Sequence, residues 1–289
     1  MKMVTTDGIM LEDGKHGLRA VVAGAWSEET TSFLLDKHIA ELELNDGKGW
    51  RGNDLKFLAD LPQLRALRIL DFKIQSVEPI HFLHDLRALE VMTYCRSEIR
   101  FSAFPRLEDC GLEWRPRAMS LFGCTTLKAL FVNNFDGKNT DPFVQLTNLE
   151  TLALLNAPIE DLRGLATLGK LRSLRLANLK RLRSLAGIER LAGLEELEIH
   201  TCRRIRSIDE IGSLRQLRKL HLNNDGDIES LKPLAKLTGL ESVLFYESTN
   251  VVDGDLSPLL GQKSLSRVSF QNRNHYSHRR EEFGPAYGG

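Results

Sequence analysis

The chain repeats one apolar phrase, Leu-x-x-Leu-x-Leu, about every 22 residues from Ile39 almost to its end. Apolar residues at positions 1, 4 and 6 of a short unit are typical of solenoids, in which every unit buries its apolar edge against its neighbours. The spacing between successive copies runs from 18 to 25 residues. The copies begin at Ile39, Leu64, Leu89, Leu107, Leu127, Leu149, Leu171, Leu194, Leu217, Leu240 and Leu265.

One repeat, residues 149–168, shows two periods in succession. Leu152 and Leu154 alternate with other residues, which predicts a short strand with one buried face. A period of three follows in Leu162, Leu165 and Leu168, and this period is typical of a 3₁₀ turn. Seven repeats place Ser or Asp directly before such a triplet, where its oxygen can accept the free N–H groups of the turn. These capping residues are Asp54, Ser76, Asp161, Ser184, Ser207, Ser230 and Asp255.

The alternation of Leu-x-x-Leu-x-Leu strands with Ile/Val-x-x-Leu-x-x-Leu-x-x-Leu turns resembles the short-repeat class of leucine-rich repeat proteins, which includes the internalins and the protein phosphatase-1 regulatory subunit. The resemblance implies an α/β solenoid shaped as a horseshoe, with a parallel concave sheet and 3₁₀ or short helical convex turns. It says little about function, because that class serves many partners. The Asn that the class has at position 9 is absent here, and Asn stands instead at position 8, in Asn156, Asn178 and Asn224.

We expect three parts. Residues 1–38 do not repeat, and a hairpin around Asp13-Gly14 followed by a helix opening at Ser27 predicts an N-terminal cap. Residues 39–272 form the array of about eleven repeats. Residues 273–289 are polar and Gly-rich, which indicates a loose C-terminal tail. His275 and His278 in that tail are compatible with a metal, but the pattern places no third ligand, so no metal is predicted.

Composition restricts the partners. The 39 basic and 39 acidic side chains cancel, and a neutral chain lacks the positive charge that drives binding to a phosphate backbone, so we expect no nucleic acid partner. No apolar run approaches 18 residues, so we expect neither a membrane span nor a secretory leader. The cysteines are scattered rather than clustered in disulfide-bonded caps, which favours the reducing cytoplasm. They are Cys95, Cys110, Cys124 and Cys202.

No catalytic motif is found. The sequence lacks a phosphate-binding loop, Gly-x-Ser-x-Gly, His-Glu-x-x-His and Cys-x-x-Cys, so we predict no enzymatic activity and no cofactor. The predicted function is a scaffold that binds a protein through its concave face. A regulatory or inhibitory subunit of an enzyme, phosphatase-like or toxin-immunity-like, is the alternative. An enzyme would have to rely on His200, His221 and Glu198.

Positions 3, 5 and 7 of each repeat face the concave surface, because they alternate with buried positions. This rule places an apolar region in the middle of the array, with Trp114, Phe131 and Leu155 as central anchors beside Val91. Exposed aromatic side chains are the usual anchors of a protein interface. The alternative is that these side chains pack against one another or against neighbouring loops and bind no partner. The two shortest spacings, after Leu89 and Leu107, predict a tighter local curve.

Two polar regions complete the predicted surface. Arg175, Glu198 and His221 follow one another across adjacent strands, with Tyr246 as a further polar contact. Such a row is explained either by cross-strand pairing or by a partner. On the rim, Lys180-Arg181 and Arg203-Arg204 occupy the same loop position in consecutive repeats. Stacked like charges repel, so this edge is either solvated or a docking site for an anionic partner.

Overall fold

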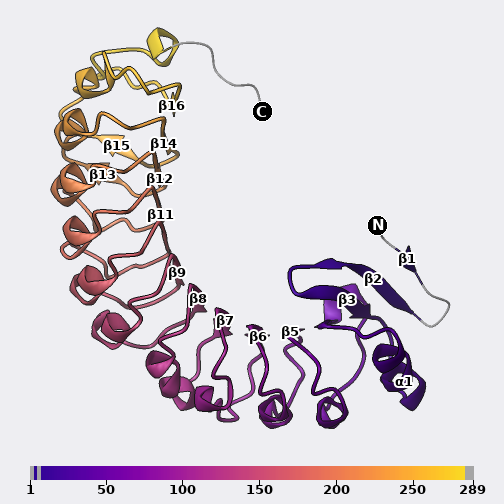
Figure 1. Ribbon diagram of the computed structural model, residues 1–289. Coiled ribbons are helices and arrows are strands. Elements are labelled where there is room, and N and C mark those ends of the chain that lie inside the picture. The colour runs from indigo at the N-terminus through magenta and orange to yellow at the C-terminus, as the bar shows by residue number, and fades with distance from the viewer. Residues whose placement is uncertain (1–2, 5–7, 284–289) are drawn as a thin grey trace. The chain divides into compact units, whose positions relative to one another are not determined.

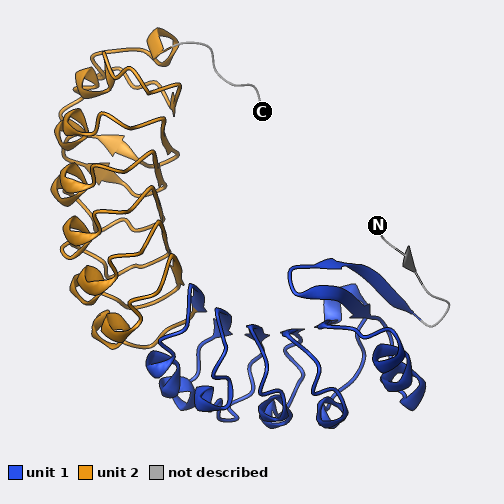
Figure 2. Ribbon diagram, in the orientation of Figure 1, with its two compact units in different colours: residues 1–132 blue, residues 133–289 orange. Residues whose placement is uncertain are grey.

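The computed structural model describes residues 3–4 and 8–283, and it divides the chain into two compact units, residues 1–132 and residues 133–289 (Figure 2). Each unit is a stack of repeats with a short strand on one side and a 3₁₀ turn on the other (Figure 1). The expected solenoid of parallel strands and 3₁₀ turns is therefore confirmed.

Unit 1 begins with an antiparallel hairpin that continues into a parallel sheet. Strands β1 to β3 are antiparallel, and β3 to β7 pair in parallel and in chain order. A helix, α1, lies between β3 and β4, and β8 contains residues of both units. The elements are β1 (Met3–Val4), β2 (Ile9–Gly14), β3 (Gly17–Val22), α1 (Glu28–Asp36), β4 (Glu41–Asn45), β5 (Ala66–Leu70), β6 (Ala88–Met92), β7 (Asp109–Glu113) and β8 (Ala129–Asn133).

Unit 2 continues the same pattern without a hairpin. Its main strands pair in parallel and residue for residue, so that Arg175, Glu198 and His221 stand directly opposite one another. They are β9 (Thr151–Leu155), β10 (Ser173–Ala177), β11 (Glu196–His200), β12 (Lys219–Asn223), β14 (Ser242–Tyr246) and β16 (Arg267–Phe270). Two further short strands, β13 (Asp227–Ile228) and β15 (Asn250–Val251), pair with each other in the loops.

The turns begin as the capping residues predict. In all seven predicted cases the side-chain oxygen accepts the backbone N–H two residues later, at 3.0–3.2 Å. The 3₁₀ turns are η1 (Asp46–Lys48), η2 (Lys56–Asp60), η3 (Glu78–Phe82), η4 (Phe101–Ala103) and η5 (Pro116–Gly123), then η6 (Asp141–Gln145), η7 (Arg163–Thr167), η8 (Ile188–Arg190), η9 (Asp209–Ser213), η10 (Lys232–Lys236), η11 (Ser257–Leu259) and η12 (Arg280–Phe283).

The core lies between the strands and the turns. Leu152 and Leu154 of β9 are fully buried, as are Leu162, Leu165 and Leu168 of the turn that follows. Burying one such side chain contributes about 1.5–3 kcal/mol. Since a repeat can complete this burial only against its neighbours, the strands hold their order through the core as well as through backbone hydrogen bonds.

The third repeat is registered three residues earlier than predicted. It begins at Leu86, not at Leu89, because Leu86, Leu89 and Val91 are the side chains that point inward. The distance from Leu64 is then 22 residues and the distance to Leu107 is 21. The predicted 18-residue repeat therefore does not exist, and the 20-residue spacing after Leu107 is the shortest in the array.

A left-handed residue turns the chain after most strands of unit 2. Position 8 has a φ between 55° and 59° in six repeats. Asparagine tolerates this conformation better than most residues, because its short polar side chain bonds locally. The column of asparagines at position 8 therefore follows from the backbone. The six residues are Asn134, Asn156, Asn178, Thr201, Asn224 and Glu247.

The N-terminal segment places a helix beside the first repeats. Ser27 Oγ accepts the N–H of Thr30 at 3.2 Å and so caps α1, whose Leu34 is fully buried. The ring of Trp26 stacks on Phe57, with the centroids 3.5 Å apart. These contacts join the non-repeating segment to the array within unit 1.

The C-terminal segment is packed where a loose tail was predicted. Tyr276 is buried, and its hydroxyl accepts the N–H of Val251 at 3.1 Å. Arg273 donates to the carbonyl oxygen of Glu247 at 3.0 Å. The expectation of a loose tail is therefore wrong from residue 273 to residue 283. Residues 284–289 lie outside the described part of the chain.

Candidate functional site

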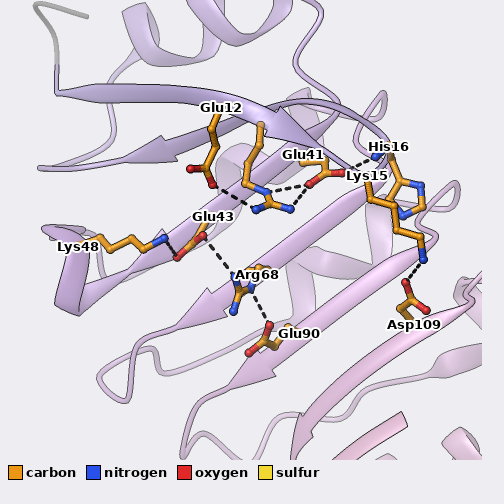
Figure 3. A network of polar contacts seen from close by, with 10 residues as sticks. Glu12, Lys15, His16, Glu41, Glu43, Lys48, Arg68, Glu90 and Asp109 are labelled. Carbon is orange, nitrogen blue, oxygen red and sulfur yellow. Dashed lines mark hydrogen bonds and ion pairs between the residues drawn. The ribbon is translucent and has the colours of Figure 1, made fainter. Parts of the chain in front are cut away.

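The strand face, formed by the side chains at positions 3, 5 and 7 of the repeats, carries paired charges in unit 1 (Figure 3). The buried carboxylate of Glu41 accepts Arg19 Nε at 2.8 Å and also the backbone N–H of His16. A side chain at Gly14 would lie 2.4 Å from the Glu41 carboxylate, so this glycine makes room for it. The hairpin is thereby fixed to the first strand of the array.

The next row is a chain of alternating charges. The buried Glu43 pairs with Lys48 at 2.8 Å and with Arg68 at 3.6 Å, and Arg68 Nε lies 2.6 Å from Glu90. Burial opposes the charge of Glu43, but the hydrogen bonds from Lys48 and Asn45 and the charge of Arg68 outweigh burial and lower its pKa. The charges of this row satisfy one another, so the row has a structural explanation.

Beside these ion pairs lies an apolar edge patch, made of Leu70, Phe72, Met92 and Tyr94. Leu70 and Met92 are half-buried and stand opposite each other at the ends of β5 and β6. Phe72 is 53% exposed and Tyr94 is 68% exposed, and their ring centroids are 4.4 Å apart. Two large aromatic side chains that remain in solvent and touch each other are typical of an interface anchor.

The predicted anchors lie elsewhere. Val91 is fully buried in the core, and Trp114 is only 8% exposed, with its ring 5.6 Å from that of Phe122. The expectation that these two side chains are exposed is wrong. Phe131 of β8 and Leu155 of β9 are half-buried. Because Val91 and Trp114 are buried, the four residues do not form the exposed apolar region that was predicted.

The apolar edge patch was missed for a physical reason. The register error placed Tyr94 at a buried position and Val91 at an exposed one. In addition, the repeats that contain Phe72 and Tyr94 lack the left-handed residue at position 8. There Asp71 and Thr93 point inward and are 1% exposed, so the aromatic residue at position 9 points outward. The absence of Asn at position 8 does not by itself identify these two repeats, because Thr201 and Glu247 are left-handed at the same position without being Asn.

In unit 2 the predicted polar row forms around one carboxylate. Glu198 lies 3.6 Å from Arg175, 3.4 Å from His200 and 3.7 Å from His221. Burial lowers the pKa of His221 although the Glu198 charge opposes that effect. Tyr246, on β14, is half-buried at the end of the same face. The structure therefore brings Arg175, Glu198 and His221 together, and cross-strand pairing explains the contacts among them.

The basic rim of unit 2, formed by Lys180, Arg181, Arg203 and Arg204, is exposed. Arg203 is held by Asn224, whose side-chain oxygen lies 2.6 Å from the guanidinium. For the other three side chains, no ion pair or hydrogen bond with a described residue is present. Adjacent parallel strands are about 4.8 Å apart, so consecutive loops hold these cations close together. The described residues thus leave the charges of Lys180, Arg181 and Arg204 without an anionic partner.

Beneath the loops of unit 2 lies a buried acid. Asp225 accepts the N–H of Cys202 at 2.7 Å, and its own N–H donates to Thr249 Oγ1 at 3.0 Å. Burial raises the pKa of Asp225 to about 7, against the lowering effect of the bonds from Cys202 and Asn223 and of the Arg203 charge. The residue takes the place at position 9 where the resembling class has Asn, and it acts in the scaffold rather than at a surface.

The described residues contain no cluster typical of a metal site. No group of three or more His, Cys, Asp or Glu residues there is arranged to hold a metal ion. Likewise, none of the described helices combines the length and apolar character that a bilayer span requires.

Comparison with known proteins supports the architecture. An internalin (InlF) from Listeria monocytogenes matches 88% of this chain and 87% of its own, with a TM-score of 0.55 and 20% identity. Strands and turns of the same kind thus recur in a known repeat protein of similar extent. The fold is that of the leucine-rich repeat proteins.

Other proteins with this leucine-rich repeat fold are larger. The TLR13 chain of a TLR13–ssRNA13 complex matches 86% of this chain but only 38% of its own, with a TM-score of 0.60 and 20% identity. A TDR receptor matches 86% of this chain and 46% of its own, with a TM-score of 0.61 and 15% identity. No protein-family model matches the sequence, and no curated protein matches it. The similarities therefore concern the fold.

Proposed function

We propose that the protein is a non-enzymatic binding scaffold that takes a protein partner on the apolar edge patch of unit 1. The observation that carries this proposal is the contact between the exposed rings of Phe72 and Tyr94, which are tilted by 36° and follow the half-buried ends of strands β5 and β6. Aromatic anchors that become desolvated on binding contribute most of the affinity of a typical interface. The paired charges of Arg68 and Glu90 beside the patch would form its polar border.

A second contact is proposed at the basic rim of unit 2. Lys180, Arg181 and Arg204 have exposed charges without an anionic partner among the described residues, and their mutual repulsion would be relieved by an acidic segment. The alternative function, a regulatory or inhibitory subunit of an enzyme, would require that enzyme to present an acidic segment to this rim. The half-buried Phe131, Leu155 and Tyr246, with the Arg175–Glu198–His221 row, remain predicted contacts of the strand face.

The compartment and the partner class also remain proposals. All four cysteines are free thiols, which supports a reducing compartment such as the cytoplasm. The absence of net charge supports a protein partner over a nucleic acid.

The test is affinity capture from the native host with the wild type and the Phe72→Ala/Tyr94→Ala double variant. A partner that uses the apolar edge patch should lose at least ~2 kcal/mol of affinity, about 30-fold in Kd. Phe82→Ala is the matched control, because Phe82 is similarly exposed, at 57%, but lies in turn η3 away from the strand face. If the double variant is folded and binds as tightly as the wild type, the proposal is wrong.

A further inference from the structure

A buried guanidinium lies beneath the loop that follows β6. Arg115 is 3% exposed, and its Nη2 donates to the carbonyl oxygen and the hydroxyl of Thr93, both at 3.2 Å. Its Nη1 points at the sulfur of Cys95 at 3.1 Å, and its Nε has no hydrogen-bond partner. No carboxylate is among the contacts that Arg115 makes with the described residues. A buried cation needs an anion, and the group in position to be one is the sulfur.

The hydroxyl groups around Cys95 have their hydrogens available for that sulfur. Thr93 Oγ1 lies 3.2 Å from Sγ and already accepts from Arg115, while Ser97 Oγ lies 3.3 Å from Sγ and already accepts the N–H of Val77. Each hydroxyl accepts one hydrogen bond from another group and keeps its own hydrogen, which it can donate to the sulfur. Three donors converge on one sulfur atom, an arrangement that suits a thiolate better than a thiol.

The other three cysteines have the opposite environment. Cys110, Cys124 and Cys202 are buried, and burial raises the pKa of each thiol, that of Cys202 to about 12. For Cys95, burial also opposes ionisation, but the hydrogen bonds from Ser97 and Thr93 and the charge of Arg115 outweigh burial and lower its pKa. Cys95 is also only half-buried, next to the exposed Tyr94. It therefore combines a lowered pKa with access to solvent.

We infer that Cys95 is a thiol-modification site, at which a thiolate held by Arg115, Thr93 and Ser97 reacts with small hydroperoxides. The sulfur attacks the distal peroxide oxygen, an S–O bond forms and the O–O bond breaks. The leaving hydroxide or alkoxide takes the proton of the sulfenic acid and departs as water or alcohol. The sulfur is oxidised by two electrons and the peroxide is reduced by two. The product is a sulfenate anion, which stays beside Arg115.

The first test measures the rate of alkylation by iodoacetamide at each cysteine between pH 5 and pH 9, read by peptide mass spectrometry. The same chain unfolded in urea is the reference. We expect the midpoint for Cys95 to lie at lower pH in the folded protein than in the unfolded chain. At pH 7, Cys95 should react at least about tenfold faster than Cys110, Cys124 and Cys202. A midpoint equal to or above that of the unfolded chain overturns the inference.

The second test adds hydrogen peroxide together with dimedone, which traps sulfenic acid. The adduct should form at Cys95 in the wild type and be absent from Cys95→Ser. Arg115→Gln removes the cation, so the alkylation midpoint should move up towards that of the unfolded chain. Because Arg115 is buried and this variant can fail to fold, Ser97→Ala offers a milder removal of one donor, with a smaller shift in the same direction. A dimedone adduct absent from Cys95, or formed mainly at the buried cysteines, contradicts the proposal.

Discussion

The Nζ atom of Lys15 lies 2.6 Å from Oδ2 of Asp109, although 94 residues separate them in the chain. Lys15 stands in the turn between β2 and β3, and Asp109 begins β7. The tip of the hairpin thus reaches the strand face of unit 1 well beyond its immediate neighbour β4 (Figure 3). The N-terminal segment is therefore joined to unit 1 both at its edge and at β7.

The two ion pairs that hold the hairpin should differ in strength. Glu41→Gln weakens a carboxylate that is buried against Arg19, so we expect a loss of about 2–4 kcal/mol in the free energy of unfolding. Lys15→Ala removes an exposed partner and should cost less than about 1 kcal/mol. Urea unfolding followed by circular dichroism measures both. Equal losses of unfolding free energy in the two variants would contradict the difference in burial between Glu41 and Lys15.

The register of the third repeat can be tested by truncating two neighbouring side chains. Val91→Ala creates a cavity in the core and should reduce the free energy of unfolding by about 2 kcal/mol. Tyr94→Ala removes a side chain that stands in solvent and should change stability by less than about 0.5 kcal/mol. Thermal and urea unfolding of both variants measure the difference. The reverse order of stabilities would restore the register that starts at Leu89.

Gly187 should not tolerate a side chain. Its φ is +112°, and an added Cβ would lie 2.4 Å from the carbonyl oxygen of Leu162. We expect Gly187→Ala to cost more than about 2 kcal/mol, since both the backbone conformation and the space oppose it. Gly169→Ala is the control, because its Cβ would meet nothing within 4 Å. A change of less than about 1 kcal/mol at Gly169, together with a large loss at Gly187, is the predicted outcome of denaturant unfolding.

The buried Asp225 should make stability depend on pH. Its pKa is raised to about 7 in the folded protein from the ordinary value of 3.8. The folded state therefore holds a proton that the unfolded state releases, and the stabilising effect, complete below pH 3.8, is lost as the pH rises through about 7. Asp225→Asn has no such titration, so the stability of this variant relative to wild type should rise by roughly 2.5 kcal/mol from pH 5 to pH 8.

Thermal unfolding of both proteins at the two pH values measures this change. A constant difference between wild type and Asp225→Asn would show that Asp225 is ionised throughout the range.

The strands and turns were predictable because each repeat carries two separate signals. One is the spacing of its apolar residues, and the other is the Ser or Asp that caps its turn. Asp161, for example, stands before Leu162 and accepts the N–H of Arg163 as its position predicts. The phase of one repeat was not predictable in the same way. Leu86-x-x-Leu89-x-Val91 and Leu89-x-x-Met92-x-Tyr94 are both acceptable apolar phrases, and burial of Val91 against its neighbours decides between them.

The prediction of the candidate site depended on the register of this third repeat. A displacement of three residues exchanges the inward and outward side chains near the strand end, so Val91 and Tyr94 exchanged their expected environments. Trp114 was misplaced for another reason. It follows β7, and its contact with Phe122 comes from η5, whose conformation the strand alternation does not report. The Cys95–Arg115 contact joins loops of two successive repeats, so no pattern within one repeat predicts it.

The left-handed residue at position 8 has a consequence for how such an array grows. In the middle of unit 2 every repeat has its own strand, its own left-handed residue and its own capped turn. The left-handed residues are Asn156, Asn178, Thr201 and Asn224. A tandem duplication of one whole segment, such as residues 171–193, would supply all the backbone geometry that the added copy needs. The backbone geometry of unit 2 is accordingly compatible with the insertion or loss of a whole repeat.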